Sequence, residues 1–101
     1  MGGSRAKLTG EALDRAVAQA SGWKCRGGQR LAKTYLFPDF AAALAFVNRV
    51  GAAAEQMGHH PDLHLAWGRV DVETWTHDAS GLTESDFALA REIDRLRSAS
   101  S

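Results

Sequence analysis

The chain has 101 residues, of which 45% are apolar and 24% charged, a composition typical of one globular domain with a single core. Its 12 Lys and Arg residues balance its 12 Asp and Glu residues, and a formal net charge of zero argues against a strong sequence-independent grip on nucleic acid. Cys25 is the only cysteine, so no disulfide can form within the chain.

The two ends of the chain differ in composition from the rest. We expect residues 1–8, which are mostly small and polar, to form a flexible tail, residues 9–97 to form a single domain, and residues 98–101 to fray. No apolar run approaches the ~20 residues that a membrane-spanning helix needs. No hydrophobic segment follows the charges of Met1–Lys7. We therefore expect a cytoplasmic protein that does not bind membranes.

The first predicted helix begins after Thr9, a residue type that caps helix N-termini, and ends at Gly22. Two short strands follow, over residues 23–26 and 31–37, and the glycine pair at 27–28 indicates a tight turn between them. The helix is predicted from apolar residues that recur at helical spacing, namely Ala12, Leu13, Ala16, Val17 and Ala20.

The second predicted helix follows Pro38 and Asp39, because a proline and a negative charge both favour a helix start. Gly58 suits the C-terminal cap of this helix, and Pro61 prevents its continuation. Its apolar stripe consists of Phe40, Leu44, Val47 and Ala54.

A second pair of strands is predicted over residues 63–67 and 70–75, where apolar and polar residues alternate on either side of a turn at 68–69. Thr83 begins the last helix, and Asp86 completes a pattern like a capping box, with Asp in place of Glu or Gln. The resulting order, αββαββα, predicts an α+β fold in which a four-stranded antiparallel sheet carries three helices on one face. The last helix has its apolar side chains at Phe87, Ala90, Ile93 and Leu96.

All four histidines lie between positions 59 and 77, and this clustering is the most informative local feature of the chain. Histidine titrates near neutrality and can give or take a proton at pH 7. Structural roles are the alternative. His59 and His60 could cap the C-terminus of the second helix. His64 could be solvated on the polar side of its strand, and His77 could be an ordinary turn residue.

Histidine and carboxylate side chains can also bind metals, and Glu55 and His59 are four residues apart and could share one helix face. However, the adjacent pair of His59 and His60 followed by proline is not a usual ligand spacing, and the chain has no HExxH motif. Cys25 lies far from the histidines in sequence and has no nucleophile motif around it. We therefore expect neither a metal nor another cofactor.

The chain resembles the pterin-4a-carbinolamine dehydratase family in one spaced pattern. The pattern begins with an acidic residue, three residues of any type, and then His, a second position that is His or Asn, and Pro. After five further residues comes an aromatic residue, after nine more His or Trp, and after eight more Asp. Leu63 and the pair at 79–80 differ from the Trp and the Cys-Gly of many members, but neither is a fixed position. The residues that match the fixed positions are Glu55, His59, His60, Pro61, Trp67, His77 and Asp86.

The resemblance implies a dehydratase that removes water from 4a-hydroxytetrahydropterin and gives quinonoid dihydropterin. This reaction recycles the tetrahydrobiopterin-type cofactor of aromatic amino-acid hydroxylases. It needs an acid for the leaving hydroxyl at C4a and a base for a ring nitrogen, both of which histidine can supply. By resemblance, His59 and His77 are the general acids, one for each face of the pterin, and His60 mainly holds the substrate and adds some base catalysis.

The resemblance also implies a set of substrate-binding residues. Glu55 would orient an imidazole or bind the amide-like edge of the pterin, and Pro61 would hold the backbone after the histidine pair. Asp86 would either orient His77 or cap the last helix. Two further candidates, which either line the pocket or only contribute to packing, are Trp23 and Trp67.

Family members form dimers by pairing strands into a longer sheet, and some dimers associate through helices into tetramers. The resemblance therefore implies a homodimer or homotetramer and a functional coupling to phenylalanine hydroxylase, and an exposed edge strand would favour such pairing. The alternative function is a non-catalytic interaction protein that stabilises a partner's dimer, because some animal members do so with a homeodomain transcription factor. Zero net charge argues against direct contact with nucleic acid in that role.

Overall fold

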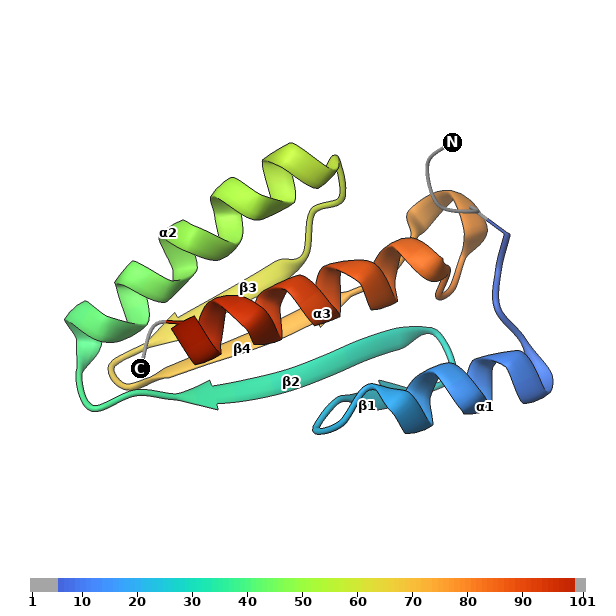
Figure 1. Ribbon diagram of the computed structural model, residues 1–101, viewed down its shortest axis with the longest axis horizontal. Helices are drawn as coiled ribbons and strands as arrows, with labels where there is room; N and C mark the ends of the chain where they lie inside the picture. Colours follow the sequence, from blue (N-terminus) through green and yellow to red (C-terminus); the bar gives the residue numbers. More distant parts are fainter. Residues whose placement is uncertain (1–5, 100–101) are drawn as a thin grey trace.

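The computed structural model describes residues 6–99, which form three α-helices and one four-stranded antiparallel sheet (Figure 1). The predicted α+β class and the order αββαββα are confirmed. The sequence pattern did not predict the short 3-10 helix η1. In chain order the elements are α1 (Gly10–Gln19), β1 (Lys24–Arg26), β2 (Arg30–Leu36), α2 (Phe40–Met57), β3 (Asp62–Ala66), β4 (Arg69–Thr74), η1 (His77–Ala79) and α3 (Glu84–Ala99).

The strands are arranged in the order β1-β2-β4-β3, so that β4, the last strand in sequence, lies in the interior of the sheet and β3 lies at an edge. The predicted alternation is visible in β4, where Val70 and Val72 are buried and Asp71 and Glu73 are partly exposed on the opposite side. Because side chains alternate along a strand, one face of the sheet is apolar, and we call the other its open face.

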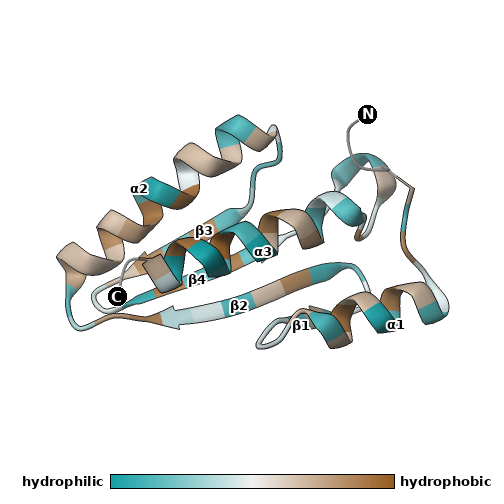
Figure 2. Cartoon of the chain, viewed as in Figure 1, coloured by the Kyte–Doolittle hydropathy of each residue, from teal (hydrophilic) through white to brown (hydrophobic). Residues whose placement is uncertain are grey.

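The core lies between the apolar face of the sheet and the helices, and Figure 2 shows apolar residues on the strands and on the helices that cover them. Phe46 of α2 is fully buried, and its ring contacts those of Tyr35 and Phe37, with centroids 4.9 and 5.1 Å apart. Helix α1 contributes Leu13 and Val17, which are only partly buried against this core. The other large core residues are Trp23, Leu31, Val50, Val70, Val72, Leu82, Phe87, Leu89 and Ile93.

The predicted signals at the ends of α2 are both present. The side chain of Asp39 accepts a hydrogen bond from the backbone N of Ala42 at 2.9 Å and caps the N-terminus. Gly58 has a φ of 66° and ends the helix in the left-handed conformation that glycine adopts most easily. Helix α1 follows Thr9 as predicted, but it ends at Gln19, before Gly22, and the Thr9 side chain makes no capping hydrogen bond.

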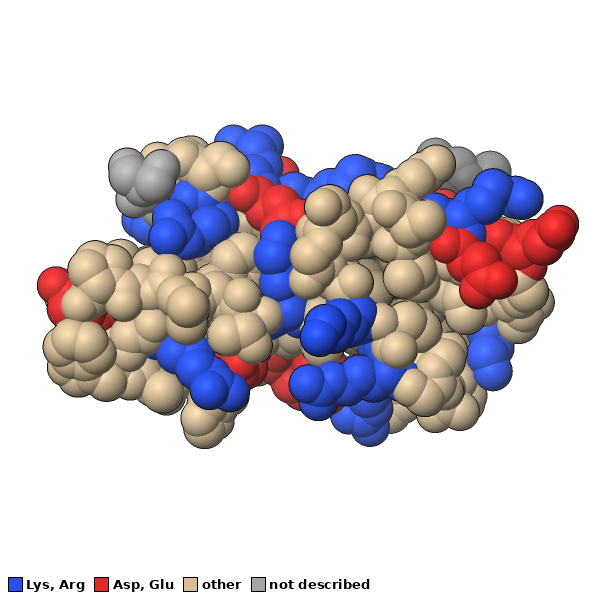
Figure 3. Space-filling view, turned by 90° about the horizontal axis from the view of Figure 1, so that it is seen from below, with Lys and Arg blue, Asp and Glu red and all other residues tan. Residues whose placement is uncertain are grey.

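Residues 1–5 and 100–101 lie outside the described residues, so the predicted tails remain predictions over those positions. Within the described part, the backbone N of Leu8 donates to the backbone O of Leu82 at 2.7 Å, and α3 continues to Ala99. None of the helices among residues 6–99 has the length and apolar character required to span a bilayer. On the face drawn in Figure 3, basic side chains lie beside acidic ones over the middle of the molecule.

Candidate active site

Two segments that are distant in the sequence meet where β3 begins and β4 ends. His59 and His60 follow α2, whose left-handed end at Gly58 turns the chain toward β3. His77 begins η1, shortly after β4. The antiparallel register pairs Asp62 with Glu73 and so brings the two segments together. They line one pocket of about 290 Å³, made by Gly58, His59, His60, Trp75, Thr76, His77 and Asp78.

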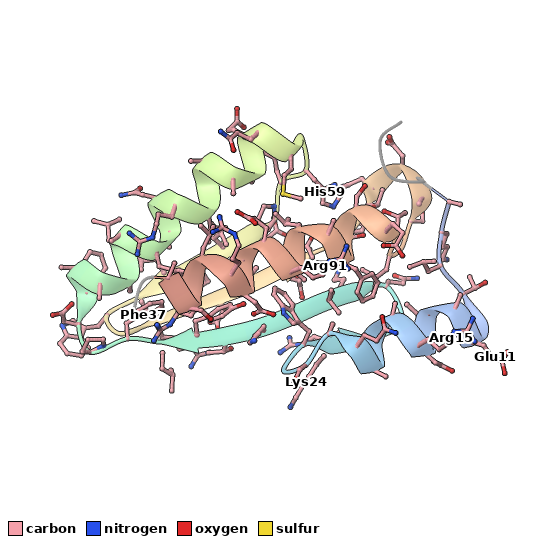
Figure 4. All side chains as sticks on the ribbon, viewed as in Figure 1. Glu11, Arg15, Lys24, Phe37, His59 and Arg91 are labelled. Carbon is pink, nitrogen blue, oxygen red and sulfur yellow. The ribbon has the colours of Figure 1, made fainter. Side chains whose placement is uncertain are left out.

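His59 is the buried member of the three pocket histidines, with 8% of its surface exposed. Its Nε2 atom lies 2.6 Å from Oδ1 of Asp86, a fully buried carboxylate in the first turn of α3. Figure 4 shows His59 in the turn after α2, beside the loop that leads into α3. A buried ring held by a carboxylate has a defined orientation, which an acid or base in catalysis requires.

Asp86 also accepts three hydrogen bonds from other groups, so that both of its oxygens are occupied. Oδ1 accepts from Oγ1 of Thr74 at 2.7 Å, and Oδ2 accepts from Oγ1 of Thr76 at 2.7 Å and from the backbone N of Thr83 at 3.0 Å. Asp86 therefore caps α3 as the capping-box pattern predicted. The imidazole that it contacts is His59, and not His77 as the other alternative proposed, because α3 packs beneath the end of β4 and His77 points to solvent.

His60 is exposed and contacts a different carboxylate. Its Nε2 atom lies 2.5 Å from Oε2 of Glu55 in the last turn of α2. An exposed pair of this kind contributes little to stability, but it restrains the direction of the ring. Glu55 thus contacts an imidazole, and its binding of the amide-like edge of the pterin stays a prediction. Pro61 is partly buried between His60 and β3.

His77 is exposed, and its ring lies on the ring of Trp75, with centroids 3.9 Å apart and an angle of 33° between the planes. The guanidinium of Arg30 lies 4.3 Å from the Trp75 ring centroid and also pairs with Glu73 at 2.9 Å. Sequence reasoning did not place Trp75 in the site. A usable signal was its position directly after β4, in phase with the polar residues Asp71 and Glu73, where an aromatic residue is unexpected.

The two tryptophans singled out from the sequence lie away from this pocket. Trp23 is buried in the core, and its Nε1 donates to Oδ2 of Asp94 at 3.0 Å. Trp67 is 68% exposed in the turn between β3 and β4, at the far end of β3 from His60. Neither lines the pocket of the three histidines within the described chain, and a role for either in substrate binding remains a prediction.

The fourth histidine, His64, is separate from the other three. It is exposed on the open face of the sheet, opposite Asp71 in the register, and lines a broader hollow of about 590 Å³. The carboxyl of Asp71 has a pKa below its usual value, first because Arg69 and Thr34 donate hydrogen bonds to it. Among residues 6–99, no group of three or more His, Cys, Asp or Glu side chains is arranged to hold a metal ion.

Residues 6–96 match the family model described as pterin 4 alpha carbinolamine dehydratase. The chain belongs to this family. It is 46% identical over 89 residues to a relative from Rubrobacter xylanophilus, covering 88% of this chain and 83% of the relative. A relative from Thermosynechococcus vestitus is 44% identical over 90 residues, covering 89% and 94%. Both are provisionally named pterin-4-alpha-carbinolamine dehydratase.

Two solved structures share the fold of this dehydratase-family chain. A transcriptional coactivator/pterin dehydratase from Brucella melitensis superposes with a TM-score of 0.84 and 32% identity, covering 89% of this chain and 97% of the other. A pterin dehydratase-like protein identified as a RuBisCO assembly factor in the alpha-carboxysome has a TM-score of 0.65 and 25% identity, covering 74% and 88%. The family resemblance seen in the sequence is thereby confirmed.

Proposed function

We propose that this chain is an enzyme that removes water from 4a-hydroxytetrahydropterin and releases quinonoid dihydropterin. The observation that supports this most directly is the meeting of three imidazoles, from two separate segments, at one pocket. The reaction requires a proton donor at the C4a hydroxyl and a proton acceptor at a ring nitrogen, and imidazole serves either need near neutral pH. The pocket, at about 290 Å³, is close to the lower limit of about 300–1,000 Å³ for small-molecule sites, which suits one bicyclic ring.

The three histidines have different surroundings, and we assign them different roles. His59, held by the Asp86 carboxylate, and His77, stacked on Trp75, act as the general acids for the two faces of the pterin. His60, restrained by Glu55, holds the substrate and assists as a base. Trp75 lies at the pocket wall and supports the ring of His77, which stacks on it.

The setting of the reaction belongs to the same proposal. We expect the chain to recycle the tetrahydrobiopterin-type cofactor of aromatic amino-acid hydroxylases in the cytoplasm, in functional coupling to phenylalanine hydroxylase. We also expect a homodimer or homotetramer. Strand β3 supports this expectation, because it is an edge strand of the sheet and presents unpaired backbone groups to a second copy.

The proposed reaction is tested by stopped-flow absorbance with synthetic 4a-hydroxytetrahydropterin. We expect the wild-type chain to accelerate dehydration, and His59→Ala and His77→Ala each to reduce the rate by about 10²–10⁴-fold, the usual contribution of one positioned proton donor. His64→Ala is the matched control, because His64 is an exposed histidine that does not line the pocket, and it should retain the wild-type rate. Circular dichroism would verify that each variant is folded.

A folded wild-type chain that gave no acceleration over the spontaneous reaction would contradict the proposal. The second candidate is an interaction protein that stabilises a partner's dimer. It is favoured by the coactivator and assembly-factor descriptions of the two structural neighbours, and by the exposed apolar side chains of α2, which are Phe40, Leu44 and Met57. Partner binding that survives His77→Ala, in a chain without dehydratase activity, would support that candidate.

A further inference from the structure

Behind His59, the buried carboxylate of Asp86 is surrounded by three threonines. Oδ1 of Asp86 contacts Nε2 of His59 at 2.6 Å and Oγ1 of Thr74 at 2.7 Å. Oδ2 contacts Oγ1 of Thr76 at 2.7 Å and the backbone N of Thr83 at 3.0 Å. Asp86 and the three threonines are each at most 1% exposed, so solvent does not supply alternative partners.

With the Asp86 side chain taken as a carboxylate, the hydrogen bonds of this group have one consistent direction. Thr76 has a single hydroxyl proton, which it donates to Asp86. The Oγ1 atoms of Thr76 and Thr83 are 2.9 Å apart, so the Thr83 hydroxyl must donate to Thr76. The backbone N of Ser85 in turn donates to Oγ1 of Thr83 at 3.3 Å. In this arrangement each hydroxyl proton points toward Asp86, whose carboxylate accepts these hydrogen bonds.

The two hydroxyls on the β4 side occupy positions where apolar residues are expected. Thr74 and Thr76 continue the buried phase of β4 that begins with Val70 and Val72. A buried hydroxyl is unfavourable unless it is hydrogen-bonded. Both of these hydroxyls donate a hydrogen bond to Asp86. The cap of α3 does not require them, because Asp86 already accepts from the backbone N of Thr83. Their contacts point instead to control of the Asp86 carboxylate.

We propose that Thr74 and Thr76 are positioning residues that act on His59 through Asp86. A carboxylate that only accepts requires a proton on the ring nitrogen facing it, so His59 carries a proton on Nε2 and exchanges its other proton at Nδ1. The consequence for catalysis rests on the proposed dehydratase function. In that reaction, the His59 imidazolium gives its Nδ1 proton to the C4a hydroxyl, which leaves as water with the electron pair of the C–O bond. A pterin ring nitrogen loses one proton to a base, so that the net change is the loss of one water.

The test compares Thr74→Val and Thr76→Val with Thr76→Ser and with a matched control, Thr34→Val. Thr34 lies on the open face, where its exposed hydroxyl donates to Asp71 at 2.6 Å, away from His59. Nitrogen chemical shifts of the labelled His59 ring report its tautomer directly. We expect the Nε2–H form in the wild type, in Thr76→Ser and in Thr34→Val, and a mixture with the Nδ1–H form in the two valine variants.

Steady-state kinetics of the same variants give the second measurement. We expect kcat of the valine variants to fall by up to about 100-fold, the effect that a misplaced catalytic group can have, with KM unchanged. Folded valine variants that keep both the Nε2–H tautomer and the wild-type kcat would overturn the proposal, as would an Nδ1–H tautomer in the wild type. If Thr76→Val does not fold, Thr74→Val alone tests the proposal. It should fold, because Thr74 lies on the buried side of β4, where valine is already present at positions 70 and 72. If the wild type lacks dehydratase activity, the proposed function fails while the tautomers still test the positioning.

Discussion

Two carboxylates of α3 each organise several side chains from other elements. Asp86 binds His59 and the threonines at the end of β4. Two turns further along the helix, Asp94 accepts hydrogen bonds from Nε1 of Trp23 at 3.0 Å, from Nζ of Lys33 at 2.8 Å and from Oη of Tyr35. Both carboxylates lie at the face of α3 that meets the sheet. Because each carboxylate accepts hydrogen bonds from several other elements, the two of them hold α3 in position on the sheet and stabilise it.

Tyr35 gives a prediction for alkaline pH. Burial, and then the hydrogen bond to Asp94, raise the pKa of its phenol well above the usual value. The folded chain therefore keeps a proton that the unfolded chain releases near pH ~10. The resulting contribution to stability is complete below that pH and is lost as the pH rises above it. Since Tyr35 is the only tyrosine, phenolate absorbance reports it alone.

We expect no phenolate signal from the folded chain at about pH 11, and a normal titration near pH ~10 in urea. Above that pH, the free energy of unfolding of Tyr35→Phe should decline less steeply than that of the wild type. The same variant has no tyrosine and serves as the blank for the absorbance measurement. If the phenolate signal of the folded chain appeared at the same pH as in urea, burial and the hydrogen bond to Asp94 would not raise the pKa of Tyr35, and the prediction would be wrong.

Among the elements, α2 is the one whose end decides where the histidine pair lies. Gly58 leaves the helix with a φ of 66°, and the backbone N of His59 donates back to the O of Ala54 at 3.2 Å. This turn directs His59 toward α3 and leaves His60 on the exposed side with Glu55. A helix that ended one residue earlier or later would rotate the pair away from both carboxylates.

Gly58→Ala should therefore destabilise the chain by about 1–2 kcal/mol, the usual cost of left-handed backbone for a residue with a Cβ. A Cβ at position 58 would meet no atom within 4 Å, so the cost is one of backbone conformation alone. Gly51→Ala is a matched control within α2, where a Cβ is equally unhindered and the φ is not positive. That substitution should instead stabilise by up to about 1 kcal/mol.

Urea denaturation of the two variants measures both free energies of unfolding. Changes of the same sign for Gly58→Ala and Gly51→Ala would contradict the explanation from backbone conformation. A shift of the His59 and His60 NMR resonances is expected only for Gly58→Ala, because only that residue lies in the turn before the pair.

In the molecule as a whole, the pocket exists only because the sheet and the helices close around one core. The site draws on the end of α2, the end of β4 and the start of α3, and these segments meet through the packing of α2 and α3 on the sheet (Figure 1). Phe46 lies at the centre of this packing and is fully buried. Its loss would weaken the packing of α2 on the sheet.

Phe46→Ala should lower the free energy of unfolding by about 3–5 kcal/mol, since it removes a fully buried ring and leaves a cavity. Phe40, also on α2, is 43% exposed, so Phe40→Ala should cost clearly less. Thermal and chemical unfolding measure the difference. Equal losses for the two variants would show that the packing around Phe46 does not carry the stability of the domain.

The order of elements could be predicted from the sequence because it depends on local signals. The alternation in β4, the cap at Asp39, the glycine at 58 and the Thr83–Asp86 pattern each act over a few residues, and the structure contains them all. The family pattern also identified the three histidines that line the pocket. Helix α1, whose end was placed too late at Gly22, has no buried residue, whereas α2 and α3 each bury several.

Contacts between distant segments were decided only by the tertiary structure. Spacing along the chain could not tell that Asp86 meets His59 rather than His77, because the choice depends on how the first turn of α3 lies relative to the end of α2. For the same reason the sequence could not decide whether Trp23 and Trp67 line the pocket or contribute to packing. It did not place Trp75, whose ring stacks on His77, among the site residues. Periodicity states which side of an element is apolar, whereas the pairing of buried polar groups follows from packing between elements.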